Sequence, residues 1–141
     1  MHRLWAQTLD MLGAGGRLGS NATKPYPCPC CGHFVFDEPP GSYDICPICF
    51  WEDDLAQLRL PRTTGANHVS LIEGQANFAA FGVCEQRFDA NVRPPRSDEV
   101  RDPQWRPLDP RRDDIEMSVP GREYGDSYPP DRTDLYYWRR T

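Results

Sequence analysis

Two cysteine pairs with the same short spacing are the residues of this sequence best suited to chemistry. They are Cys28-Pro29-Cys30-Cys31 and Cys46-Pro47-Ile48-Cys49. A gap of two residues lets both thiolates of one tight turn point at a single ion, and two such turns place four sulfurs around it. The spacing therefore predicts a structural Zn²⁺ site with the ligands Cys28, Cys31, Cys46 and Cys49.

Other uses of paired cysteines fit this sequence less well. A redox pair of the thioredoxin type needs a surrounding strand–helix–strand pattern, which the sequence lacks. A zinc deaminase needs a His-x-Glu sequence, and none precedes Cys28. Catalytic zinc keeps one coordination position open, whereas four cysteines fill all four. We therefore assign no catalytic residue from the cysteine pattern.

Two further cysteines and two histidines are candidate ligands that the predicted site does not need. Cys30 lies inside the first pair, where we expect a small residue beside the metal, with a redox-sensitive thiol as the alternative. Cys84 is expected to be a small buried apolar residue. His33 and His68 could replace a ligand, but four well-spaced cysteines leave no need for either.

A run of acidic residues, Glu52-Asp53-Asp54, follows the second pair. Paired carboxylates can act as acid and base or hold a hard cation, so a hydrolase using this run is one alternative function. Such a run is more often a solvated face, or a set of acids at the N-terminus of a helix, here ahead of Leu55 and Leu58.

The hydrophobic pattern predicts a β-hairpin between the two pairs. Residues 33–37 have the aromatic and β-branched composition of a strand, residues 38–41 are a turn, and residues 42–45 are a returning strand. This hairpin would carry one cysteine pair at each base. Because only 38% of the residues are hydrophobic, we expect the metal to supply stability that a small core cannot.

The clearest predicted helix follows the acidic run. Ser70 is its N-cap, Glu73 completes a capping box, and Gly82 ends it. Leu71, Phe78 and Phe81 can share one face of this helix, and we expect that face to pack against the hairpin.

The two ends of the chain differ from the middle in composition. Residues 1–12 could form a short amphipathic helix, and a glycine-rich linker follows it. From residue 93 onward the chain holds eight of its fifteen prolines and ten arginines, which predicts an extended, partly disordered arm. The arm ends in the aromatic sequence Tyr136-Tyr137-Trp138, so it either folds back onto the domain or docks on a partner.

The predicted fold class is thus a small α+β domain. It consists of a zinc-ribbon-like β-hairpin with two cysteine knuckles plus one packed helix, and it carries an extended Pro/Arg/Asp-rich C-terminal arm. The predicted boundaries are an N-terminal extension at 1–24, a zinc-binding domain at 25–95 and the arm at 96–141.

The charge of the chain is concentrated in the cysteine-bearing part. Residues 26–92 hold nine acids and three arginines, whereas the arm from residue 93 holds eleven acids and ten arginines. A nucleic-acid-binding protein would concentrate positive charge on its folded part, so nucleic acid is the less favoured partner. No apolar stretch is long enough for a membrane helix, and residues 1–12 lack the features of a signal peptide. We therefore expect a cytoplasmic protein with no membrane partner.

Three stretches of the sequence resemble the small bacterial cysteine-rich CPCC family. They are Tyr26-Pro27-Cys28-Pro29-Cys30-Cys31-Gly32, Pro39-Pro40-Gly41-Ser42-Tyr43, and Ile45-Cys46-Pro47-Ile48-Cys49-Phe50-Trp51-Glu52-Asp53-Asp54. The resemblance covers roughly residues 25–95 and implies a compact zinc-binding domain with the same four cysteines as ligands. Some members of that family accompany toxin systems, so the resemblance also implies a role as an immunity protein.

The favoured function is therefore a non-enzymatic zinc module that binds another protein. A basic partner, such as a toxin that the module neutralises, would complement the acidic domain. The alternatives are a nucleic-acid-associated regulatory zinc ribbon, which would use the arginines after residue 92, and the hydrolase described above.

Overall fold

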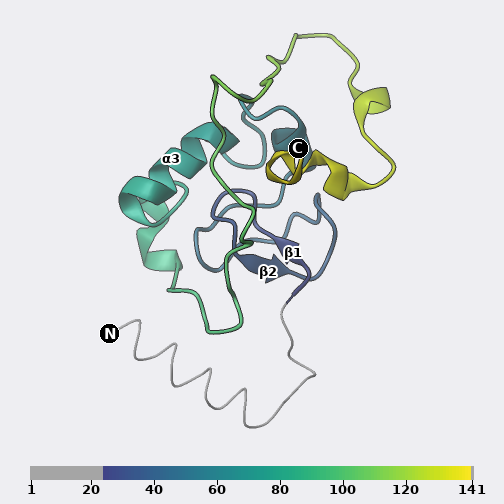
Figure 1. Ribbon diagram of the computed structural model, residues 1–141. Coiled ribbons are helices and arrows are strands. Elements are labelled where there is room, and N and C mark those ends of the chain that lie inside the picture. Colours follow the sequence, from purple (N-terminus) through teal and green to yellow (C-terminus); the bar gives the residue numbers. More distant parts are fainter. Residues whose placement is uncertain (1–23, 141) are drawn as a thin grey trace.

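The computed structural model describes residues 24–140, so the predicted helix at 1–12 and the linker after it lie outside the described residues. The described part holds two short strands, two α-helices and several short 3-10 helices (Figure 1). These elements are β1 (Tyr26–Pro27), β2 (Phe34–Phe36), α2 (Leu55–Arg59), α3 (Leu71–Phe81), η2 (Gln86–Asn91), η3 (Gly125–Ser127), η4 (Arg132–Leu135) and η5 (Tyr137–Arg139). Within residues 24–140, no helix combines the length and the apolar character that a bilayer crossing requires.

The two strands form an antiparallel hairpin around the first cysteine pair. Tyr26 pairs with Phe36 and Pro27 pairs with Phe34, so the chain between them is the first cysteine turn. A single bridge between Ile45 and Glu52 flanks the second cysteine turn in the same way. The predicted class, a small α+β zinc-ribbon-like fold, is confirmed.

The predicted pairing of residues 33–37 with residues 42–45 is wrong. The strand that pairs with Phe34–Phe36 is Tyr26–Pro27, and residues 42–45 form a loop. The backbone explains the difference, because Gly41 has a φ of 98° and Tyr43 has a φ of 64°. Two left-handed residues within three positions turn the chain out of the extended conformation that a strand requires.

The predicted helix is confirmed as α3. The Ser70 hydroxyl accepts a hydrogen bond from the amide of Glu73, the Glu73 carboxylate accepts one from the amide of Ser70, and Gly82 ends the helix with a φ of 78°. Leu71 is fully buried, but Phe81 is 52% exposed, so the prediction that Phe81 packs against the hairpin is wrong.

The close approach of α3 to the core explains why Phe81 stays outside. A Cβ atom on Gly74 would lie 3.1 Å from the Trp51 ring and 3.3 Å from the sulfur of Cys30. Phe78 also packs against the core, and the helix approaches it most closely at Gly74, which has no side chain. Phe81 lies two turns further on, beyond this contact.

The described part of the arm folds back along the domain. The stretch around Arg106 and Leu108 runs between α3 and the C-terminal turns (Figure 1). The amide of Phe34 donates to the carbonyl of Val100 at 2.9 Å, and the amide of Leu108 donates to the Gln75 side chain on α3 at 2.8 Å. Of the two possibilities that the composition left open, the structure thus shows contact with the domain itself.

The C-terminal residues complete the hydrophobic core. Leu135, Tyr136, Tyr137 and Trp138 are all buried, and the rings of Tyr136 and Trp138 stack with 4.6 Å between their centroids. Asp102 holds this end of the chain in place. Its carboxylate accepts hydrogen bonds from the Trp138 indole at 2.9 Å and from the Arg139 guanidinium at 3.0 Å.

The contacts of Asp102 predict an acid-sensitive contribution to stability. Burial alone would raise the pKa of Asp102, but hydrogen bonds from Gln104, Trp138 and Arg139 outweigh it and lower that pKa. A carboxyl whose pKa is lowered by folding stabilises the protein above its unfolded pKa, and this stabilisation is lost as the pH falls through the folded pKa. Asp102→Asn should therefore cost about 1.5–3 kcal/mol at neutral pH, and the cost should shrink as the pH falls below the ordinary aspartate pKa of about 3.9.

Thermal unfolding of the wild type and of Asp102→Asn between pH 7 and about pH 2 measures this difference. Asp126→Asn is the control, because Asp126 is an exposed acid of the same arm. A cost that stays the same from neutral to acid pH would show that the charge of Asp102 has no part in holding the C-terminus.

Candidate metal centre

The two cysteine turns share one backbone design. In each turn, the amide of the residue after the second cysteine donates to the carbonyl of the first cysteine. The distances are 2.7 Å from Gly32 to Cys28 and 2.9 Å from Phe50 to Cys46. Both donors have a left-handed backbone, with a φ of 82° at Gly32 and 71° at Phe50. The two halves of the site are thus built alike although one turn lacks a glycine.

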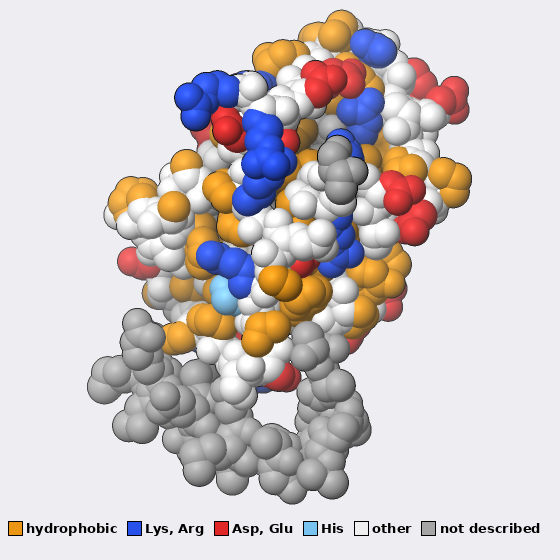
Figure 2. All heavy atoms as spheres, in the orientation of Figure 1, with side chains coloured by type: hydrophobic (Ala, Val, Ile, Leu, Met, Phe, Trp, Pro, Cys, Tyr) orange, Lys and Arg blue, Asp and Glu red, His pale blue; other side chains and the backbone are white. Residues whose placement is uncertain are grey.

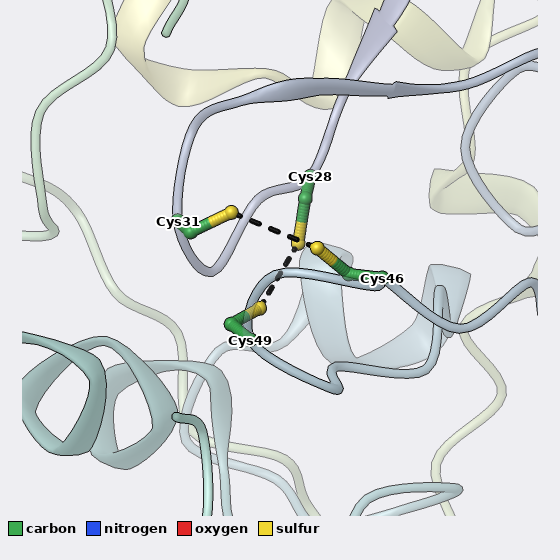
Figure 3. A group of neighbouring side chains, drawn as sticks. All are labelled: Cys28, Cys31, Cys46 and Cys49. Carbon is green, nitrogen blue, oxygen red and sulfur yellow. Dashed lines mark hydrogen bonds between the residues drawn. The ribbon is translucent and has the colours of Figure 1, made fainter. Parts of the chain in front are cut away.

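The four sulfurs meet at the point where the two turns face each other (Figure 3). The sulfurs of Cys28 and Cys49 are 3.6 Å apart, those of Cys31 and Cys46 are 3.8 Å apart, and all four lie within 4.8 Å of one another. A disulfide needs about 2.05 Å, so these cysteines are not bonded to one another. A tetrahedron with metal–sulfur bonds of about 2.3 Å has edges of about 3.8 Å, and the distances of 3.6 Å and 3.8 Å fit such an edge.

Burial makes this cluster a poor place for uncompensated charge. All four side chains are fully buried. Burial raises the pKa of Cys28 and of Cys49, and it raises the pKa of Cys31 to about 11. Burial acts on Cys46 too, but hydrogen bonds from the three neighbouring thiols outweigh it and lower the pKa of Cys46. Four buried thiolates therefore require a cation among them, and a dication would supply the compensating charge.

The comparison with known protein families agrees with this geometry. A family model described as cysteine-rich CPCC matches residues 26–99, which is more than half of the chain. The chain belongs to the cysteine-rich CPCC family. No curated protein matches the chain with significant similarity. The matched segment contains all four clustered cysteines, so this CPCC protein is a metal-binding module.

Residues beyond the matched segment cover the first turn of the CPCC site. The Trp105 indole donates to the carbonyl of Pro29 at 3.0 Å, and the Arg101 side chain donates to the carbonyl of Cys31 at 2.9 Å. Sequence reasoning missed both residues. The one available signal was a tryptophan within a proline-rich arm, because a fully extended arm has no use for a large aromatic side chain.

The contact of Trp105 with the first turn predicts that Gly32 cannot carry a side chain. A Cβ atom on Gly32 would lie 2.6 Å from the Trp105 ring, whereas the space around Gly82 is open within 4 Å. Both glycines have a positive φ, of 82° and 78°, so alanine strains the backbone at either position. Gly32→Ala should therefore cost about 1–3 kcal/mol more than Gly82→Ala, because Trp105 must also move.

Denaturant unfolding of the two metal-loaded variants measures this difference. Gly82→Ala serves as the matched control for backbone strain. Equal losses of stability in the two variants would show that Trp105 does not close over the turn in solution.

The remaining cysteines and histidines of the CPCC domain lie outside the cluster. Cys30 is fully buried, and Cys84 is 2% exposed, as expected for a small buried residue. Burial raises the pKa of the Cys84 thiol. The His33 ring lies 2.6 Å from the carbonyl of Glu99, and the His68 ring contacts Arg87. Neither histidine is among the four side chains that are close enough together to hold a metal ion.

The acidic run of the CPCC domain has a structural role. Asp54 caps α2, where its carboxylate accepts from the amides of Ala56 and Gln57, which confirms the interpretation as an acid at a helix N-terminus. Asp53 is 1% exposed, so the interpretation of the run as a solvated face is wrong for this residue. Burial raises the pKa of Asp53, and hydrogen bonds from Ser42 oppose this shift.

Proposed function

We propose that this chain is a structural-zinc module that acts by binding another protein. The observation that carries the zinc assignment is the group of four buried sulfurs at tetrahedral spacing. Cys28, Cys31, Cys46 and Cys49 would be the ligands. Because four protein ligands close the coordination sphere, the metal would hold the fold together and offer no open position to a substrate.

Metal analysis of the purified protein tests the zinc assignment. We expect one zinc ion per chain after purification without added metal. Replacement by Co²⁺ should give the absorption bands of a tetrahedral tetrathiolate site, and Cys46→Ser should remove them. A protein purified folded and without metal would refute the assignment.

The charge of the domain supports a basic protein partner. Residues 26–92 hold nine acids against three arginines, and a zinc ion with four thiolates adds two further negative charges. Acidic surfaces attract basic partners and speed their association. A toxin neutralised by this binding is the partner class that we propose, and the chain would then act as an immunity protein.

A nucleic-acid partner has less support, because several of the arginines after residue 92 are paired with acids. Arg93 contacts Glu99 at 2.7 Å, and Arg106 contacts Asp113 at 2.7 Å. Figure 2 shows the same mixture on the face of the molecule that it draws. In the upper half of this view, where the arm runs, Lys or Arg side chains lie beside Asp or Glu side chains. Mixed charge does not concentrate the positive potential that a phosphate backbone needs.

A hydrolase based on the acidic run also has less support. Asp54 accepts hydrogen bonds from the amides of Ala56 and Ala66, and Asp53 accepts them from Gly41 and Ser42. Both carboxylates are therefore engaged in holding loops. If Asp53→Ala abolished a measurable hydrolytic activity while zinc was retained, that result would reverse this judgement.

Co-purification from the native host at low salt tests the protein-binding function. We expect a basic protein in stoichiometric amount, released as the salt concentration rises. Recovery of the chain alone, together with steeply salt-dependent binding to DNA or RNA, would favour the nucleic-acid alternative.

A further inference from the structure

The loop before the second cysteine turn exposes two large hydrophobic side chains close together in sequence. Tyr43 is 56% exposed and Ile45 is 48% exposed, and the acid between them, Asp44, is exposed as well. Ile45 directly precedes the metal-site residue Cys46 and is bridged to Glu52. The loop is therefore attached to one half of the metal centre.

A buried carboxylate holds this loop in one conformation. The Asp53 side chain accepts from the amide of Gly41 at 3.1 Å and from the hydroxyl of Ser42 at 2.9 Å. The backbone of Asp53 continues the support, because its carbonyl accepts from the amide of Tyr43 at 3.0 Å and its amide donates to the carbonyl of Asp44 at 2.9 Å. A surface that is already ordered loses little conformational entropy on binding.

The fold itself gives no reason for a large aromatic residue at position 43. Its φ of 64° is a conformation that glycine adopts more easily, and its side chain is more than half exposed. The ring of Tyr43 therefore adds little to the core, and the backbone of Tyr43 is strained. An exposed aromatic residue on a fixed loop is, however, well suited to be the anchor of an interface.

The charges around the loop indicate which chemistry would pack on Tyr43. Asp37 and Glu38 precede the loop and are exposed, and Asp44 lies within it. Two cations lie nearby: Lys24 pairs with Asp37 at 3.1 Å, and Arg132 donates to the carbonyl of Pro40 at 3.3 Å. Acids still outnumber bases, so the surroundings favour a cationic ligand.

The chain also shows how an arginine would use such a ring. The guanidinium of Arg139 lies 4.9 Å from the centre of the Tyr136 ring, and that of Arg101 lies 4.9 Å from the centre of the Trp105 ring. A partner arginine over Tyr43 could make the same contact and also reach Asp44.

We infer that residues 41–45 form the contact surface for an arginine-rich segment of another protein, with Tyr43 and Ile45 as its apolar anchors. This inference rests on the proposed protein-binding function and adds to it the position of the interface and the class of ligand. The metal centre would hold the end of the loop through Cys46, and the hydrogen bonds of Asp53 would hold residues 41–44.

Site-specific photocrosslinking in the native host tests the position. A benzoylphenylalanine residue replaces Tyr43 in one full-length variant and Phe81 in the other. Phe81 is the matched control because it is 52% exposed and lies at the end of α3. We expect crosslinks from position 43, not from position 81, to a segment of another protein rich in arginine.

The crosslinked segment, made as a synthetic peptide, then tests the anchors by fluorescence anisotropy with zinc-loaded protein. Tyr43→Ala should weaken binding by about tenfold or more, and Phe81→Ala should change it by less than about twofold. Retained zinc content and circular dichroism would show that both variants are folded.

The other outcomes separate the two proposals. Crosslinks from position 81 alone, or equal binding of the peptide by both variants, would overturn this surface and leave the protein-binding function standing. Crosslinks from position 43 to a second copy of this chain or to a segment without basic residues would overturn the ligand class. An absence of protein crosslinks from both positions, together with recovery of the chain alone, would count against the protein-binding function itself.

Discussion

Removal of the metal by a strong chelator is expected to unfold the domain around the four cysteines. Structural zinc supplies about 10–16 kcal/mol in small zinc peptides, whereas a whole domain is stable by about 5–15 kcal/mol. The described part of this chain has only two strands, of two and three residues, and these cannot be stable alone. We expect circular dichroism and amide exchange to show loss of structure over residues 26–51, with α3 loosened because it packs on them.

Two cysteine substitutions separate the metal from the thiols in general. Cys49→Ser removes one of the four clustered sulfurs and should abolish stable folding, whereas Cys84→Ser leaves the cluster intact and should keep its metal. Cys84 is the demanding control, because it is also buried. A chelated protein that kept the native spectrum and a cooperative unfolding transition would contradict the proposed role of the metal.

Ending the chain at Thr133 should have the second large effect. This deletion removes Leu135, Tyr136, Tyr137 and Trp138, all of which are buried in the core. Loss of one large buried aromatic residue costs about 3–5 kcal/mol, so loss of the whole group should exceed the stability of a typical small domain. We expect a poorly soluble or unfolded chain even when zinc is present in excess.

A shorter deletion and a point variant keep this test informative. Removal of Arg140 and Thr141 should be nearly neutral, because Arg140 is exposed and its hydrogen bonds, to the carbonyls of Asp134 and Tyr137, are long at 3.2–3.3 Å. Trp138→Phe retains a ring but loses the hydrogen bond to Asp102, and it should lower the melting temperature without unfolding the chain. A chain ending at Thr133 with the wild-type melting temperature would show that the C-terminus does not complete the core in solution.

The sequence was most informative where spacing alone determines geometry. The Cys-Pro-x-Cys pairs predicted which four sulfurs come together, and the capping box at Ser70 and Glu73 predicted where α3 begins. Both signals are local, because each depends on residues that are three positions apart and are read directly from the chain.

The strand pairing and the path of the arm could not be predicted in this way. The pattern of residues 33–37 correctly indicated a strand, but nothing in it distinguishes a partner at 26–27 from one at 42–45. Tyr43 has a left-handed backbone that its residue type does not predict. Non-local contacts of single side chains, such as Trp105 with the first cysteine turn, leave no periodic signal at all.

The arrangement of the core has a consequence for how this protein is made. The cysteines of the metal centre precede Leu135 to Trp138 by more than half of this sequence, so they are synthesised well before them. At about 5–20 residues per second, roughly 4 to 18 s separate the two parts on the ribosome. The nascent chain can therefore collect its metal well before it can close its core. A chain whose translation stops before Leu135 would hold the four metal-site cysteines but lack the residues that cover the core, and the exposed hydrophobic interior would mark it for proteolysis.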